Sequence, residues 1–140
     1  MTPPTGLLDT SAVLRLGELD AADLPDEIVI SAITLAELSV GPLVATDEPE
    51  RAARLAQVQQ VEADYGDPLP FDARTARVFA QVAADIRRAG SKSKARAFDA
   101  LIAATAKAAG LPLYTFNPRD FAAVTGVEIV PLPPPPHDSV

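Results

Sequence analysis

The sequence contains no cysteine and only one histidine, which removes several classes of chemistry. Without cysteine the chain can form no disulfide, no thiolate zinc site and no thiol nucleophile. The single histidine, His137, lies in a proline-rich stretch near the C-terminus, which argues against a catalytic imidazole. Any metal binding must therefore rest on hard oxygen ligands, which suit Mg²⁺ or Mn²⁺.

Long apolar runs and glycine-rich loops are also missing. No stretch approaches roughly eighteen uninterrupted apolar residues, so the sequence predicts no transmembrane helix. The first residues carry no positive charge, and Asp9 interrupts their apolar run, unlike a secretory signal peptide. None of the seven glycines forms a G-x-G-x-x-G or Walker pattern, which argues against a nucleotide-binding enzyme. We expect a soluble, cytoplasmic protein with no membrane partner.

Basic residues are scarce and unevenly placed. The chain has 12 Lys and Arg against 19 Asp and Glu, a net charge of −7. One stretch nevertheless holds five bases and no acid: Arg87, Arg88, Lys92, Lys94 and Arg96. These residues are candidates for contact with the phosphates of RNA. The alternative is that they only solvate a helix end and its loop.

The apolar pattern predicts short strands that alternate with helices. Of the 140 residues, 48% are hydrophobic, which is enough for the core of one domain. Strands are expected at residues 6–8, 27–30, 69–71, 113–116 and 127–130, and helices at 12–19, 32–43, 47–64, 73–89 and 94–109. This alternation favours an α/β fold with a parallel sheet covered on both faces. We assign residues 1–130 to one domain and 131–140 to a flexible proline-rich tail outside the fold.

Four acidic residues interrupt or border segments that otherwise predict buried core: Asp9, Glu37, Asp99 and Asp120. A carboxylate among apolar residues is costly unless its charge is offset. In a chain with no cysteine and one histidine, the sequence favours a divalent cation as the positive charge that balances these carboxylates. In parallel sheets, functional groups gather at the carboxyl ends of the strands, and Asp9 directly follows the first one.

Each acid also has a purely structural explanation. Asp9 could cap the helix that follows it, although Thr10 and Ser11 could cap it instead and leave Asp9 for another task. Glu37 shares its helical row with apolar residues, yet it could simply be exposed.

The two later acids differ in how well a structural role explains them. Asp99 is the one acid of an apolar, alanine-rich helix, where Asp is a mediocre helix former, although Arg96 could neutralise it. Asp120 falls at the third position of a short helix that Asn117 would cap, where an acid is expected without any function.

Taken together, the four acids and their surroundings resemble the PIN domain, specifically the toxin nucleases of VapC type. The resemblance covers nearly the whole chain through four segments: LLDTSAVL (7–14), ISAITLAELSVG (30–41), AFDALIAATA (97–106) and LYTFNPRDF (113–121). It implies a three-layer α/β/α fold on a five-stranded parallel sheet.

The resemblance also implies roles for individual residues. Asp9, Glu37 and Asp99 match the acidic triad of the family, and Asp120 matches the acid of its T-x-N-x-x-D-F segment. The supporting polar positions are Thr10, Ser11, Thr115 and Asn117. Some members carry an acid at the position of Asn117, so the fourth ligand is open between Asn117 and Asp120. Our hypothesis is that Asp9 and Asp99 ligate Mg²⁺ directly, while Glu37 and Asp120 act through water or bind a second ion.

The substrate implied by this resemblance is RNA, hydrolysed to leave a 5′-phosphate. A VapB-like antitoxin would block the site with a basic side chain, and the chain would form a homodimer. Two other functions remain open: a PIN ribonuclease that is not a toxin, and a non-catalytic interaction module that a metal stabilises. A phosphoryl-transfer domain is disfavoured because no second acid stands two residues after Asp9.

Overall fold

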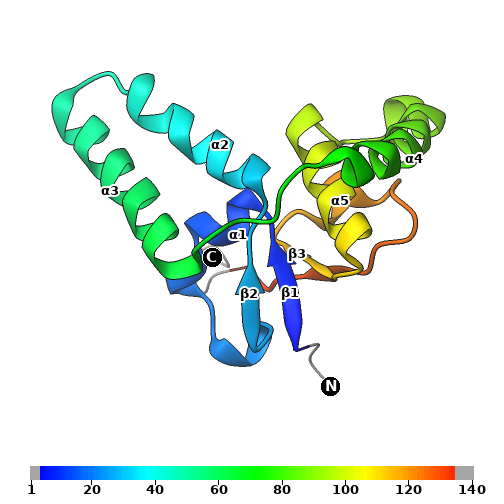
Figure 1. Ribbon diagram of the computed structural model, residues 1–140, viewed down its shortest axis with the longest axis horizontal. Helices are drawn as coiled ribbons and strands as arrows, with labels where there is room; N and C mark the ends of the chain where they lie inside the picture. The colour runs from blue at the N-terminus through cyan, green and yellow to red at the C-terminus, as the bar shows by residue number, and fades with distance from the viewer. Residues whose placement is uncertain (1–3, 135–140) are drawn as a thin grey trace.

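Four short parallel strands form the centre of the computed structural model, which describes residues 4–134 (Figure 1). In sheet order they are β2 (Glu27–Val29), β1 (Thr5–Leu8), β3 (Leu113–Thr115) and β4 (Ile129–Pro131). The five α-helices are α1 (Thr10–Leu14), α2 (Ala32–Val40), α3 (Glu48–Tyr65), α4 (Ala73–Ala89) and α5 (Ala97–Ala109). Short 3-10 turns follow several of them, including η3 (Gly41–Leu43), η4 (Gly90–Lys92) and η5 (Pro118–Phe121).

Alternate residues of the central strands point into two different cores. Leu7 of β1 and Leu113 of β3 are fully buried in a cluster with α4 and α5. Their neighbours Leu8 and Tyr114 are buried in a second cluster with α1, α2 and α3. Because successive side chains of a strand face opposite sides, both faces of the sheet are covered. The predicted three-layer α/β/α arrangement is confirmed.

The sheet has four strands rather than the predicted five. At the expected position of the fifth, only Leu69 pairs, as an isolated parallel bridge to Ser31. The Leu69 amide donates to the Ile30 carbonyl at 2.9 Å. Its partner Ser31 is the N-cap of α2, where the neighbouring segment turns into a helix, so the pairing does not continue along that segment.

The C-terminal boundary lies later than predicted. Pro131 belongs to β4, and Leu132 is only 5% exposed, with its amide bonded to the Thr115 carbonyl at 2.8 Å. The predicted tail at 131–140 therefore begins too early, because its first residues complete the sheet. The rest of that tail from residue 135, including His137, lies outside the described residues.

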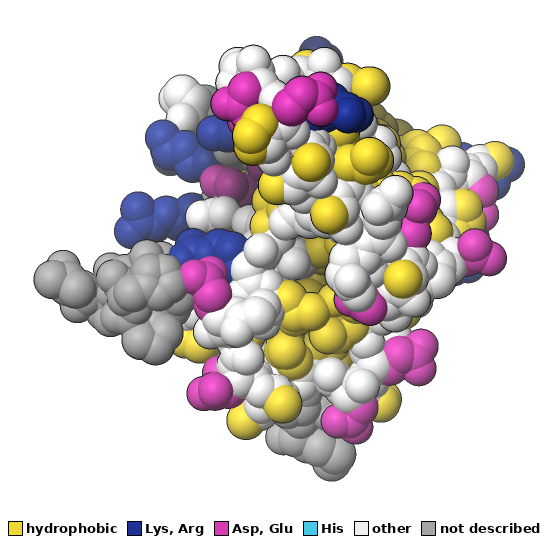
Figure 2. Space-filling view, turned by 90° about the vertical axis from the view of Figure 1, so that its left-hand side faces the viewer, with side chains coloured by type: hydrophobic (Ala, Val, Ile, Leu, Met, Phe, Trp, Pro, Cys, Tyr) yellow, Lys and Arg dark blue, Asp and Glu magenta, His cyan; other side chains and the backbone are white. Residues whose placement is uncertain are grey.

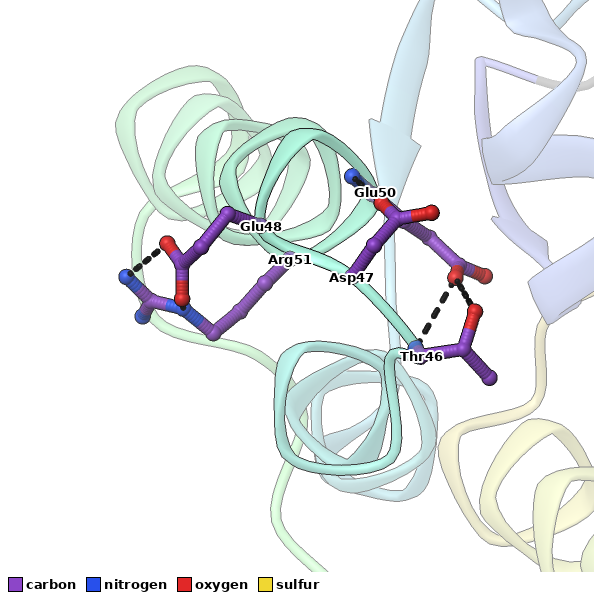
Figure 3. A network of polar contacts seen from close by, with 5 residues as sticks. All are labelled: Thr46, Asp47, Glu48, Glu50 and Arg51. Carbon is purple, nitrogen blue, oxygen red and sulfur yellow. Dashed lines mark hydrogen bonds and ion pairs between the residues drawn. The ribbon is translucent and has the colours of Figure 1, made fainter.

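Helices α2 and α3 form an antiparallel arm beside the sheet (Figure 1). Asp47 caps α3 by accepting from the Glu50 amide at 2.8 Å, and Glu50 accepts in turn from the amide and hydroxyl of Thr46 (Figure 3). The first bond satisfies the Glu50 amide, which the first turn of a helix leaves without a backbone partner, and the others fix the chain just before the helix. Arg54 of α3 donates to the Gly41 carbonyl at 3.0 Å, which ties the arm together at its turn. Among residues 4–134, no helix is long and apolar enough to cross a membrane.

Candidate active site

Asp9 lies at the carboxyl end of β1 and is only 5% exposed. Its Oδ1 accepts from the Ala12 amide and the Ser11 hydroxyl, both at 2.9 Å. Its Oδ2 accepts from the hydroxyl of Thr115, at the end of β3, at 2.5 Å. Asp9 is therefore the N-cap of α1, and of the alternatives that the sequence leaves open neither Thr10 nor Ser11 takes that role. Capping occupies one carboxylate oxygen and does not neutralise the charge.

Glu37 reaches the same end of the sheet from α2. Its Oε1 accepts from the Thr10 hydroxyl at 2.7 Å. The Thr10 hydroxyl also lies 3.0 Å from that of Thr34, a fully buried residue one helical turn before Glu37. Glu37 is thus half-buried and held by α1, rather than free in solvent.

Asp99 stands in the first turn of α5, because that helix begins at Ala97 and not at Lys94 as predicted. Its Oδ2 accepts from the Arg96 amide at 3.0 Å. An acid at this position is a normal N-terminal capping partner, so the argument that Asp99 interrupts a helix interior was wrong. The start of α5 nevertheless places this carboxylate within reach of the charges of Asp120 and Asp9.

Asp120 and Asn117 both follow β3 and line one pocket together with Lys94 and Arg96. Asp120 is the third residue of η5, as predicted, but the Asn117 side chain does not cap that turn. The backbone amide of Asn117 instead donates to the Thr115 hydroxyl at 2.9 Å. Because that hydroxyl donates in turn to Asp9, the bond connects this segment to Asp9.

The charges of these acids act on one another. Burial is the main cause that raises the pKa of Asp9, and the negative charge of Asp120 raises it further. Burial also raises the pKa of Asp99, with Asp120 and Asp9 adding to the effect. The pKa of Glu37 is raised by burial and then by the charges of Asp99 and Asp9. All four predicted acids therefore share one electrostatic site.

This donor set fits a hard divalent cation, because carboxylates that repel one another gain from a shared positive charge. Within residues 4–134, however, no group of three or more acids is already arranged to hold a metal ion. The hydrogen bonds explain this, since Asp9, Glu37 and Asp99 each point toward a donor of the protein. Binding a metal would require some of these carboxylates to turn from those donors.

The five predicted basic residues do not act as one patch. Lys94 and Arg96 line the pocket with Asp120, whereas Arg88 pairs with Asp85 on α4 at 3.3 Å. Arg87 lines a separate groove between α4 and α5, and Lys92 lies exposed in η4. Two further residues near the site were not among the predicted ones: Thr34, which lies beside Thr10, and Arg119, which lines the pocket of Asp120. Each stands within three residues of a site acid in the sequence, and this was the signal that could have identified them.

The free energy of unfolding should depend on pH through Asp99. Its folded-state pKa is raised, so the folded protein retains a proton that the unfolded chain releases above a pH of about 4. The metal-free protein therefore loses stability as pH rises through the folded-state pKa. Asp99→Asn keeps an acceptor for the Arg96 amide but carries no charge, so we expect a higher Tm than wild type at pH 8 in EDTA.

This difference in Tm should shrink toward zero as pH falls below about 4, where both side chains are neutral. Thermal melts from pH 3 to pH 8 measure it. Asp67→Asn, at an exposed acid in the turn after α3, is the matched control. A destabilised Asp99→Asn at pH 8 would contradict the account of mutual repulsion.

Comparison with known proteins agrees with this geometry. The PIN domain family model matches residues 7–127. Ribonuclease VapC5 of Mycobacterium tuberculosis is 40% identical over 134 residues, which cover 94% of this chain and 96% of the relative. Ribonuclease VapC8 of the same species is 37% identical over 103 residues, covering 73% and 90%.

A solved structure shares the architecture. It is that of VapBC-5 from Mycobacterium tuberculosis, a member of the VapBC family of toxin–antitoxin systems. It matches with a TM-score of 0.76 and 37% identity, over 93% of this chain and 100% of that one. The family match runs from β1 to just before β4 and includes the five helices and all four site acids, so this chain belongs to the PIN domain family.

Proposed function

We propose that the protein is the toxin ribonuclease of a VapBC-type toxin–antitoxin pair and hydrolyses RNA at the four carboxylates. The observation that carries this is the gathering of Asp9, Glu37, Asp99 and Asp120 at one end of the sheet, with the pKa of Asp9, Glu37 and Asp99 raised by burial and by neighbouring acids. Its relatives VapC5 and VapC8 are named ribonucleases, which supports the same reaction here.

Asp9 and Asp99 would hold a divalent cation directly, with Glu37 and Asp120 in support. PIN-domain nucleases of VapC type are metal-dependent, and for this chain we propose Mg²⁺, with Mn²⁺ as the alternative. The bound ion would neutralise charge on the phosphate and make water a better nucleophile. Water attacks phosphorus, the bond to the 3′-oxygen breaks, and the products carry a 5′-phosphate and a 3′-hydroxyl.

The residues around the acids prepare them for this task. Thr115 and Ser11 fix the Asp9 carboxylate in one orientation, and Thr10 does the same for Glu37. Since the pKa values of Asp9, Glu37 and Asp99 are raised, protons compete with the metal at low pH. Activity should therefore rise with pH as the carboxylates ionise.

Cleavage of end-labelled RNA with and without Mg²⁺ tests the proposal. Wild type should cut only with the metal and leave a 5′-phosphate, and Asp99→Asn should not cut. Equal cutting by wild type and Asp99→Asn would sink the assignment of Asp99. Toxicity is tested separately by expression in a bacterial host, where growth arrest that Asp99→Asn relieves is expected. Unchanged growth would indicate a PIN ribonuclease that is not a toxin.

Thr115→Val tests how Asp9 is positioned. The hydroxyl of Thr115 lowers the pKa of Asp9 by donating to its charged form, and valine keeps the shape but not the donor. We expect about tenfold lower kcat/KM at pH 7, as for other residues that orient metal ligands, with partial recovery at higher pH. Thr115→Ser is the control that keeps the hydroxyl. A pH profile of Thr115→Val that superimposes on wild type would rule out this role.

A VapB-like antitoxin is the partner we expect, in the cytoplasm. Apolar side chains remain exposed at the turn of the α2–α3 arm, where Val40 is 49%, Leu43 85% and Val44 61% exposed. Figure 2 shows apolar side chains on the face that this arm presents. Contiguous exposed apolar surface is typical of protein interfaces. The antitoxin, or a second copy of this chain in a homodimer, would cover it.

A further inference from the structure

A pocket of about 450 Å³ adjoins the carboxylates, between the segment before α5 and the segment after β3. It combines three cations, an aromatic ring, an amide and one acid: Lys94, Arg96, Arg119, Phe116, Asn117 and Asp120. Asp120 lines this pocket, and its charge raises the pKa of Asp9 and Asp99, so the pocket lies beside the other site acids. A ligand in the pocket would lie next to the reacting phosphate.

Two cations of this pocket differ from the paired arginines of α3 and α4. Arg51, Arg54 and Arg88 each form an ion pair with an acid on their own helix. In the part of the chain that the structure describes, no acid forms an ion pair with Lys94 or Arg119. Both side chains are exposed in a protein of net charge −7. Figure 2 likewise shows Lys and Arg side chains gathered along one edge of the molecule. Unpaired cations beside a pocket favour an anionic ligand.

The aromatic ring points to a ligand with a flat group. Phe116 is half-buried at the end of β3 and lines the pocket. The guanidinium carbon of Arg15 stands 4.9 Å from the centroid of its ring, which holds the ring in place by a cation–π contact. Single-stranded nucleic acid is bound by this combination, in which bases stack on aromatic rings while cations meet the phosphates.

We propose that this pocket binds the nucleotide next to the scissile phosphate of single-stranded RNA. Arg119 and Lys94 contact a neighbouring phosphate. Phe116 stacks with the base, and the side-chain amide of Asn117 faces the edge of that base. This inference rests on the proposed ribonuclease function and assigns Arg119 and Phe116 a role in substrate binding.

Binding of a fluorescein-labelled single-stranded RNA, followed by anisotropy in a salt titration, tests the proposal. All proteins carry Asp9→Asn, so that binding is measured without turnover. Arg119→Gln should weaken binding several-fold and flatten the slope of log K against log salt by about 0.7, the loss of one phosphate contact. Phe116→Leu should weaken binding about tenfold with an unchanged slope, because stacking releases no counterion.

Arg77→Gln is the matched control, since it removes one positive charge from an exposed position on α4 outside the pocket. It should leave the slope and the affinity within about twofold of the parent, because no phosphate contact is lost. Equal effects of Arg77→Gln and Arg119→Gln would overturn the pocket assignment, as would parental binding by Arg119→Gln. The RNA affinity of Phe116→Leu is compared with that of the parent only if the two proteins have the same Tm. If they do not, the affinity and salt slope of Arg119→Gln, at an exposed position, decide the test. Failure of the wild type to cut any RNA would instead refute the proposed function.

Discussion

Asp9→Asn is expected to lower RNA cleavage on the order of a thousandfold while the protein stays folded. Asp9 is the most deeply buried of the four acids, and three donors fix its carboxylate. Asparagine can still accept from the Ala12 amide and cap α1, but it has no charge with which to hold a cation. Losing one preorganised electrostatic group in an active site commonly costs a hundredfold to a thousandfold.

Initial rates on labelled RNA at saturating Mg²⁺ measure this effect, with circular dichroism to confirm folding. Asp67→Asn removes an acid of the same type outside the site and should cleave like wild type. Activity of Asp9→Asn within about threefold of wild type would mean that Asp9 is only a helix cap.

Gly6→Ala is expected to produce the largest loss of stability, about 2–3 kcal/mol. Gly6 lies in β1, where an added Cβ would overlap Cε1 of Tyr114 and lie 2.9 Å from its Cδ1 and 3.0 Å from Cγ of Pro25. Tyr114 is 1% exposed and cannot move aside without disturbing the core around it. Strand β1 would have to shift, and Asp9, which directly follows this strand, would shift with it.

Urea unfolding of Gly6→Ala, compared with Gly17→Ala, measures this cost. An added Cβ at Gly17 would meet nothing within 4 Å, so that variant should be neutral or slightly stabilising. Because β1 positions Asp9, Gly6→Ala should also lose activity. If the two variants had equal free energies of unfolding, the packing of Gly6 against Tyr114 would be looser than described.

The order of strands and helices was predictable because apolar runs, glycines and capping residues mark their ends. Ser31, Asp47 and Asp72 are residue types that favour the N-cap, and each caps the helix that follows it. The prediction of a fifth strand was wrong because a short apolar run at Leu69 does not distinguish a single bridge from a ladder. The start of α5 also cannot be fixed from composition, so the sequence predicts Asp99 inside the helix rather than in its first turn.

The grouping of the four acids was predictable, but the bonds that hold them were not. The acids stand out because they occupy apolar surroundings, and the family resemblance grouped them. The bond from Thr115 to Asp9 joins residues 106 positions apart and exists only because β1 and β3 are neighbours in the sheet. Residue spacing carries no information on such contacts. The same reason hides the pairing of Thr10 with Glu37 and the stacking of Arg15 on Phe116.

The central claim is that these carboxylates form one metal site, and titration of the metal-free protein with Mg²⁺ or Mn²⁺ tests it most directly. Calorimetry and thermal melts should show saturable binding that raises the Tm of wild type, because a ligand that prefers the folded state stabilises it. Asp99→Asn should start from a higher metal-free Tm at pH 8 and gain little from the metal. Equal metal stabilisation of wild type and Asp99→Asn, or no binding by wild type, would contradict the account.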